Sequence, residues 1–311
     1  MNQLLIGIEI GGTKLQVVLG NCKGEITDRQ RFKVDRASGA QGIRDQIKGA
    51  LANYLRGKGN IVGIGVGFGG PVDREGGQIA CSHHISGWSG FPMKDWLKSL
   101  TDLPVIMDND ANVAALGEAL AGAGKGCNPI FYVTLGSGVG GGVVVDGAIY
   151  HGSKPSESEI GHIRLDRSGL IVEQECSGWA VDRKIREAVK ERPDSCLAQL
   201  IGNSSSNEAE FLGDALKANC PLAQSILKET SQSLAFALSH VTHLFHPEAI
   251  ILGGGLSLLG QPLLKGVAVE FSQYLMEALK PGPVISLAEL REDVVPVGAL
   301  LMAGAAFLCA D

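Results

Sequence analysis

The stretch Met107-Asp108-Asn109-Asp110 places several polar side chains directly after a short apolar run that is typical of a buried strand. Asp and Asn are common N-cap residues, so one of them could simply begin a helix over 111–121. Transfer of a phosphoryl group to a hydroxyl needs a carboxylate that accepts the proton and a group that orients the acceptor. We therefore predict that Asp110 is the base and that Asn109 orients the acceptor.

A glutamate and two glycines follow the first predicted strand, Ile6–Ile10. Burial of the Glu9 carboxylate is costly unless a partner compensates its charge, although Glu9 could instead lie on a solvated strand end. Gly11 and Gly12 would let main-chain N–H groups approach phosphate oxygens, helped by the Thr13 hydroxyl, and such a turn binds anions without a helix terminus. In this interpretation Glu9 faces Mg²⁺, most often through water.

A second glycine turn follows the predicted strand at 130–135 and contains the pattern G-x-G-x-x-G. A dinucleotide fingerprint would need a helix after the last glycine, but a β-branched run and Asp146-Gly147 follow instead and predict a hairpin. The turn repeats the plan of the first one, with its candidate ligands at Thr134, Gly136, Ser137 and Gly138. A glycine-rich hairpin alone can be plain turn geometry. Two of them in equivalent positions indicate two related domains that face each other across a cleft.

The composition narrows the class of protein. A chain of 311 residues with 45% hydrophobic and 19% charged residues is typical of a two-domain globular protein. The net charge of −6 argues against nucleic acid as a partner. Seven scattered cysteines favour a reducing compartment over a disulfide framework, and no signal peptide is apparent. The apolar run Val297–Ala310 is too short to span a bilayer, so we expect a buried helix and no membrane partner.

Six motifs together resemble the ROK (repressor, open reading frame, kinase) family of sugar kinases and regulators. In chain order they are EIGGTK, GFGGPVD, DNDAN, TLGSGVGGG, EIGH and LGGG. The resemblance covers nearly the whole chain and implies an α/β, actin-like (ribonuclease H-like) ATPase fold of two domains that closes over ATP and a hexose in a central cleft. We expect domains at 1–122, completed by the C-terminal helix 296–311, and at 123–295.

The resemblance also implies roles for residues that match the motifs by position. Asp110 resembles the general base. The sugar contacts would be Gly70, in the loop Gly69-Gly70-Pro71, together with Asn109, Glu159, His162 and Glu173. The nucleotide contacts would be Gly11, Gly12, Thr13, Lys14, Thr134, Gly136, Ser137, Gly138, Gly254 and Gly255, the last two near the adenosine. His162 could also be a core histidine with no role in binding.

Three departures from the family pattern stand out. Glu9 occupies a position where family members usually carry Asp, which keeps the charge but shifts the metal geometry. The cysteine-rich zinc motif is missing, since only Cys176 lies within reach after His162, so we expect no zinc. His84 lies where the family usually has a Pro-Asn pair, and it could replace a sugar-binding Asn or simply pack.

These observations favour a cytoplasmic, ATP- and Mg²⁺-dependent kinase, most simply a glucokinase, that phosphorylates a hexose at its primary hydroxyl. A kinase of the same family for N-acetylmannosamine, N-acetylglucosamine or fructose is the alternative. A sugar-sensing regulator would carry a helix-turn-helix ahead of the first strand, which here begins within a few residues. A non-catalytic sugar-binding protein on the same fold is the third interpretation. The resemblance suggests a homodimer.

Overall fold

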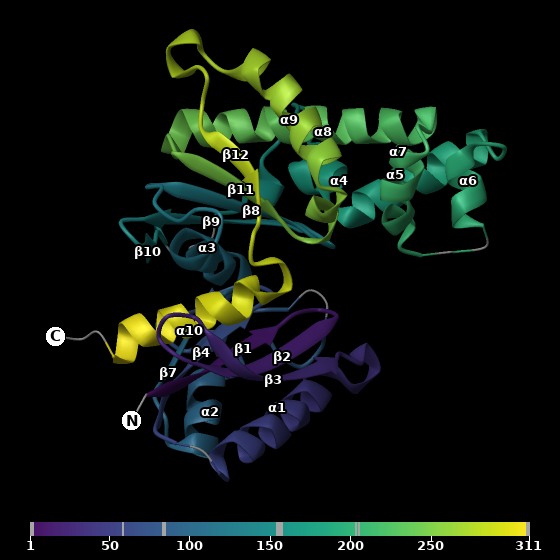
Figure 1. The fold of residues 1–311 in the computed structure, drawn as a ribbon. Helices are drawn as coiled ribbons and strands as arrows, with labels where there is room; N and C mark the ends of the chain where they lie inside the picture. Colours follow the sequence, from purple (N-terminus) through teal and green to yellow (C-terminus); the bar gives the residue numbers. More distant parts are fainter. Residues whose placement is uncertain are drawn as a thin grey trace. The chain divides into compact units, whose positions relative to one another are not determined.

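The computed structural model describes residues 3–57, 59–82, 85–153, 158–202, 204 and 206–308 (Figure 1). The chain forms two compact units. Unit 1 comprises Met1–Gly126, Gly142–Ser158 and Glu289–Asp311, and unit 2 comprises Cys127–Gly141 and Glu159–Ala288. The units differ from the expected domains mainly at 142–158. That segment groups with unit 1 because Gly142 lies against Ala111 and Ala115 of helix α3 (Asp110–Ala121).

Unit 1 contains a five-stranded sheet in the order β3-β2-β1-β4-β7. The strands are β1 (Leu4–Ile10), β2 (Lys14–Gly20), β3 (Ile26–Lys33), β4 (Ile61–Phe68) and β7 (Val105–Asn109). Strands β1, β2 and β3 form an antiparallel meander, and β4 and β7 run parallel to β1. A separate pair joins β5 (Val72–Asp73) and β6 (Gln78–Ile79). The carboxyl ends of β1, β4 and β7 therefore lie at the same edge of the sheet.

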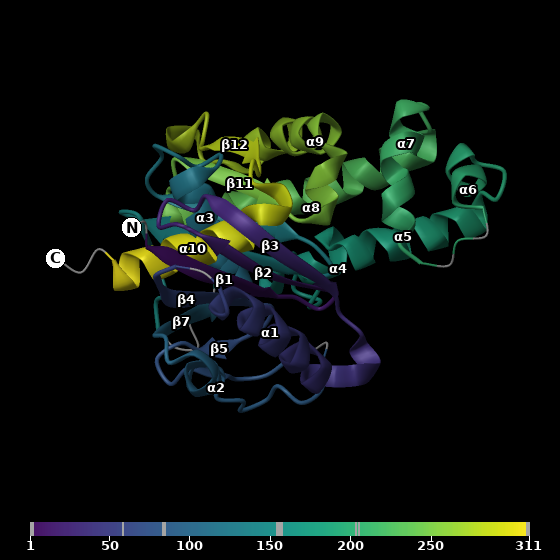
Figure 2. The same cartoon turned by 60° about the horizontal axis from the view of Figure 1, so that its bottom comes forward.

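Helices cover both faces of this sheet. Alternate side chains of β1 and β2 pack with α1 (Gly39–Leu55) and α2 (Met93–Thr101) in one apolar core. The opposite face packs on α10 (Val294–Phe307), where Leu5 and Val18 contact Leu300 (Figures 1 and 2). A Cβ on Gly65 would collide with the carbonyl of Ala299, so glycine in β4 lets α10 approach the sheet closely.

Unit 2 is built around the second sheet, whose order is β10-β9-β8-β11-β12. The strands are β8 (Ile130–Leu135), β9 (Val139–Val145), β10 (Ala148–Ile149), β11 (Ala249–Gly253) and β12 (Val284–Leu287). Strand β11 runs parallel to β8 and to β12. The chain passes from unit 2 to unit 1 within β9, after Gly141.

The α-helices of unit 2 are α4 (Val172–Cys176), α5 (Gly178–Glu191), α6 (Cys196–Ile201), α7 (Leu212–Lys217), α8 (Pro221–Phe245) and α9 (Gln261–Phe271). The short 3-10 helices in the described part of the chain are η1 (Arg36–Ser38), η2 (Ile160–His162), η3 (Glu208–Phe211), η4 (Gly255–Leu259), η5 (Ser272–Tyr274), η6 (Glu277–Leu279) and η7 (Arg291–Asp293). Figure 1 shows α9 lying along α8.

One disulfide joins Cys196, the first residue of α6, to Cys220, which precedes α8. The sequence predicted no disulfide framework, and this single pair does not form one, since Cys22, Cys127 and Cys176 are free. The spacing of the paired cysteines in the sequence carries no signal, because the helices between them bring the two residues together. Within the described residues, no helix is long and apolar enough to cross a membrane.

Candidate active site

The first glycine turn lies between β1 and β2 in unit 1. The Gly11 N–H donates to the Lys14 carbonyl at 2.9 Å and closes the turn, so this amide is already engaged. The Gly69 N–H donates to the Ile10 carbonyl at 2.8 Å. The loop that begins at Gly69 therefore lies beside the turn, and both line a small hollow together with Trp88.

Glu9 is buried at the end of β1, with 8% of its surface exposed. Its Oε1 lies 3.2 Å from Lys14 Nζ, and its Oε2 accepts a 2.7 Å hydrogen bond from Gln16 Nε2. Burial raises the pKa of Glu9, while the charge of Lys14 and the hydrogen bond from Gln16 oppose that rise. The alternative of a solvated strand end is therefore wrong for Glu9. The Lys14 ammonium, predicted to bind phosphate, is paired with this carboxylate.

Asn109 and Asp110 lie at the junction of β7 and α3. The Asn109 Oδ1 caps the helix by accepting from the Ala111 N–H at 2.8 Å, and its Nδ2 donates to the Gly70 carbonyl at 3.2 Å. Asn109 therefore both caps the N-terminus of α3 and contacts the loop predicted to bracket the sugar. Asp110 is the first residue of α3 and is partly buried.

The electrostatic environment of Asp110 is that of a base near neutral pH. Burial and then the negative charge of Glu9 raise its pKa to about 7, against smaller opposing effects of the Ala111 N–H and of Lys14. A carboxylate with a pKa near the working pH suits general-base catalysis. Perturbed carboxylates of this kind are enriched at functional sites.

A magnesium ion beside Glu9 would have to be held chiefly through water, because Lys14 and Gln16 already contact the two carboxylate oxygens. Mg²⁺ commonly binds proteins through one or two carboxylates and takes its other ligands from water and phosphate. Glu9 is one such carboxylate, and its charge already acts on Asp110, so a cation there would relieve the repulsion. Among the described residues, no group of three or more His, Cys, Asp or Glu side chains could hold a metal ion by itself.

The second glycine turn joins β8 to β9 and is braced by Glu173 of α4. The Gly136 N–H donates to the Gly138 carbonyl at 3.0 Å. Glu173 Oε2 accepts from the Val139 N–H at 2.9 Å, and a Cβ on Gly138 would collide with this oxygen. The carboxylate lies directly against the main chain at Gly138, so a larger residue there would require the Glu173 side chain to move.

The other predicted residues of unit 2 surround the same turn. Thr134 pairs with Gly253 in the β8–β11 register, and Gly254 lies against the main chain of Leu135. On the other side Gly161 packs on Val139, which places η2 beside the start of β9. The structure thus brings Gly254 of the LGGG motif against Leu135, before the turn, and Gly161 of the EIGH motif against Val139, after it. Ser137 lies within the turn, and Gly255 begins η4.

His162 and Glu159 are exposed on unit 2. His162 Nδ1 lies 3.7 Å from Glu159 Oε2, and both side chains are more than half exposed. The alternative prediction that His162 is a core histidine is therefore wrong. His84 lies outside the described residues.

The sequence analysis did not predict the contacts of Gln16 with Glu9 or of His151 with Asp108. Gln16 is fully buried and contacts Glu9 across the β1–β2 pair. Asp108, considered above only as a cap, accepts from Asn112 Nδ2 at 3.0 Å and lies 2.6 Å from His151 Nε2. Cross-strand register would have identified Gln16, whereas His151 lies 43 positions away in the sequence.

Known proteins resemble this chain along most of its length. The model of the ROK family matches residues 5–306. A glucokinase of Halalkalibacterium halodurans is 34% identical over 306 residues, covering 94% of this chain and 92% of that protein. A glucokinase of Thermotoga maritima is 30% identical and covers 95% of each. The crystal structure of a ROK family glucokinase from Streptomyces griseus, in complex with glucose and AMPPNP, superposes with a TM-score of 0.84, 30% identity and coverage of 96% and 99%. The expected actin-like α/β fold class is confirmed.

Proposed function

The chain belongs to the ROK family, and from this premise we propose that it is an ATP-dependent hexose kinase, most simply a glucokinase. The observation that carries the proposal is the partly buried Asp110, whose pKa is raised to about 7 at the first residue of α3. The glucose and ATP analogue bound by the Streptomyces griseus relative support a hexose and ATP as the substrates.

In the proposed reaction Asp110 accepts the proton of the primary hydroxyl as its oxygen attacks the γ-phosphorus. The bond to the β,γ-bridging oxygen breaks, and ADP leaves with the electron pair. Asn109 and the loop at Gly70 hold the sugar, joined by Glu159, His162 and Glu173. Positioning and electrostatic stabilisation account for most of the catalysis in phosphoryl transfer.

The two glycine turns would bind the nucleotide. Main-chain N–H groups of Gly12 and Thr13, and those of Ser137 and Gly138, would offset the negative charge of the phosphates. Gly254 and Gly255 would contact the adenosine. Glu9 would hold Mg²⁺ through water, and the ion would supply further stabilisation of the charge on the phosphate oxygens. The site would work without zinc.

We further propose that the sugar is glucose, that the enzyme acts as a homodimer in the cytoplasm, and that its product enters carbohydrate breakdown. Discrimination between hexoses depends on one or two hydroxyl contacts in the pocket. A substrate panel therefore decides the sugar more directly than the sequence does.

The experiment is a coupled assay of ADP release with Mg-ATP and a panel of glucose, fructose, mannose, N-acetylglucosamine and N-acetylmannosamine. We expect glucose to stimulate turnover most strongly. Asp110→Asn keeps the shape of the side chain but removes the base, so it should lower kcat about a hundredfold or more.

A matched control is Asp95→Asn, because Asp95 also lies in the first turn of a unit 1 helix but is exposed. This variant should keep the wild-type kcat. Absence of sugar-stimulated ADP release in the wild type would favour a non-catalytic sugar-binding protein. If an acetamido sugar alone stimulated turnover strongly, that sugar and not glucose would be the substrate.

A further inference from the structure

Gln16 is a fully buried polar side chain in the unit 1 sheet, and its amide is engaged on both sides. Its Nε2 donates to Glu9 Oε2 at 2.7 Å and to the Glu292 carbonyl at 3.0 Å. Its Oε1 accepts from Arg31 Nε at 2.9 Å and from Arg29 Nη1 at 3.4 Å. A buried amide whose hydrogens and oxygen are all engaged is held in one orientation.

The sheet register explains this orientation. Glu9, Gln16 and Arg31 lie directly opposite one another on β1, β2 and β3. Side chains in such a row are close enough to interact. The order of groups is carboxylate, amide, guanidinium. A flipped amide would direct its N–H groups at the guanidinium and its oxygen at the carboxylate, so the row holds the NH₂ group against Glu9.

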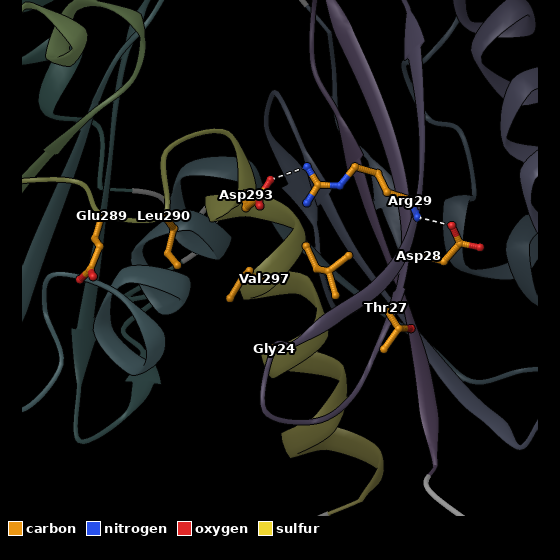
Figure 3. Close-up of a pocket in the computed structure, with 9 residues that line it drawn as sticks. Gly24, Thr27, Asp28, Arg29, Glu289, Leu290, Asp293 and Val297 are labelled. Atoms are coloured by element: carbon orange, nitrogen blue, oxygen red, sulfur yellow. Dashed lines mark hydrogen bonds and ion pairs between the residues drawn. The ribbon is translucent and has the colours of Figure 1, made fainter.

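The outer end of the row is held by η7, just before α10. Arg29 Nη1 lies 2.6 Å from Asp293 Oδ1. Figure 3 marks this ion pair with a dashed line. Arg31 Nη1 lies 3.3 Å from Glu292 Oε2. These ion pairs are partly exposed and contribute little to stability by themselves. They do fix the direction of the two guanidinium groups that orient Gln16.

We propose that Gln16 is a positioning residue that holds the Glu9 carboxylate in the geometry needed for phosphoryl transfer. The inference rests on the proposed kinase function. Glu has one more rotatable bond than the Asp that the family resemblance would place at position 9. The hydrogen bond from Gln16 removes the freedom that this bond adds, which gives the longer carboxylate a defined position.

The sharpest variant is Gln16→Glu. It keeps the size of the side chain and an acceptor for Arg31, but it replaces the donor to Glu9 with a second carboxylate. Like charges directly opposite each other on a sheet repel. We expect kcat to fall about tenfold or more while the KM for hexose changes less than about threefold. Gln16→Met removes the hydrogen-bond donor without adding charge and should also lower kcat. It provides the test if Gln16→Glu does not fold.

The matched control is Gln30→Glu on the neighbouring strand β3. Gln30 is partly buried, and its Nε2 donates to the Ala50 carbonyl at 3.3 Å, away from Glu9. It should keep the wild-type kcat. A Gln16→Glu or Gln16→Met variant with a kcat no lower than that of this control would overturn the proposal.

A second measurement does not depend on activity. The double variant Glu9→Gln with Gln16→Glu exchanges the two side chains. It therefore restores one hydrogen-bond donor and one acceptor between positions 9 and 16. We expect its Tm to exceed that of Gln16→Glu alone, while kcat stays low because the carboxylate has left position 9. Additive effects on Tm, or a restored kcat, would overturn the proposal. A wild type without kinase activity would contradict the proposed function instead, and the Tm cycle would still test the contact.

Discussion

The ionisation of Asp110 decides the pH range in which it can accept a proton. Its pKa is raised to about 7, so the free enzyme carries the base in its inactive, protonated form below that pH. We expect kcat/KM for hexose to increase with pH, with a midpoint near 7, and to level off above it. A series of initial rates at subsaturating hexose measures this limb. An activity already constant from about pH 5 upward would show that another group is the base.

Individual residues were predicted unevenly from the sequence. Asp110 and Asn109 could be found because they follow a strand and exceed what helix capping needs. The sequence could not show that the Gly11 N–H is engaged within its own turn, or that Lys14 pairs with Glu9. Both depend on how the main chain closes the turn. The role of Gln16 depends on register, since a slip of one residue would turn it to the other face of the sheet.

Glu173 of the short helix α4 contacts the second glycine turn and is also proposed to contact the sugar. Two substitutions can separate these two roles. Glu173→Gln keeps an acceptor for the Val139 N–H, so the turn and the KM for ATP should change little. It removes the charge that would strengthen a hydrogen bond to the sugar, so the KM for hexose should rise about tenfold.

Glu173→Ala removes the brace as well, and the KM for ATP should then rise together with the KM for hexose. The comparison of the two variants by steady-state kinetics checks the assignment. If Glu173→Gln changed only the KM for ATP, Glu173 would serve the turn and not the sugar.

The elements themselves were largely predictable where local patterns decide them. Both strand–turn–strand units are present, and Asp146 takes the positive φ of 52° expected in an Asp-Gly hairpin. The glycines of β4 were harder to interpret. The motif GFGGPVD predicted a sugar loop at Gly69-Gly70-Pro71. No pattern in the sequence indicated that Gly65 and Gly67 lie under α10, where added side chains would collide with Ala299 and Val295. That packing depends on a helix from the other end of the chain.

Glu118 connects two places where the chain passes between the units. It is fully buried near the end of α3 and accepts from the Ala123 N–H at 2.7 Å, shortly before the chain leaves unit 1. It also accepts from the N–H groups of Glu289 at 3.2 Å and Leu290 at 2.9 Å, where the chain re-enters. One carboxylate on the helix that begins with Asp110 therefore anchors both segments.

Loss of this carboxylate should destabilise the protein. Glu118→Ala leaves three main-chain N–H groups without their charged acceptor, so we expect the free energy of unfolding to fall by about 3 kcal/mol or more. Urea unfolding measures the change, with Glu187→Ala on the exposed face of α5 as the control. A loss no larger than that of the control would show that the two segments are held by other contacts.

The whole account depends on Asp110 meeting the acceptor hydroxyl of a hexose. The most direct test is a crystal structure of the protein with glucose and a non-hydrolysable ATP analogue. We predict an Asp110 carboxylate oxygen within about 2.6–3.2 Å of the primary hydroxyl oxygen, with the γ-phosphate beyond it. A bound glucose whose primary hydroxyl faces a different side chain, with Asp110 directed away from it, would contradict the account.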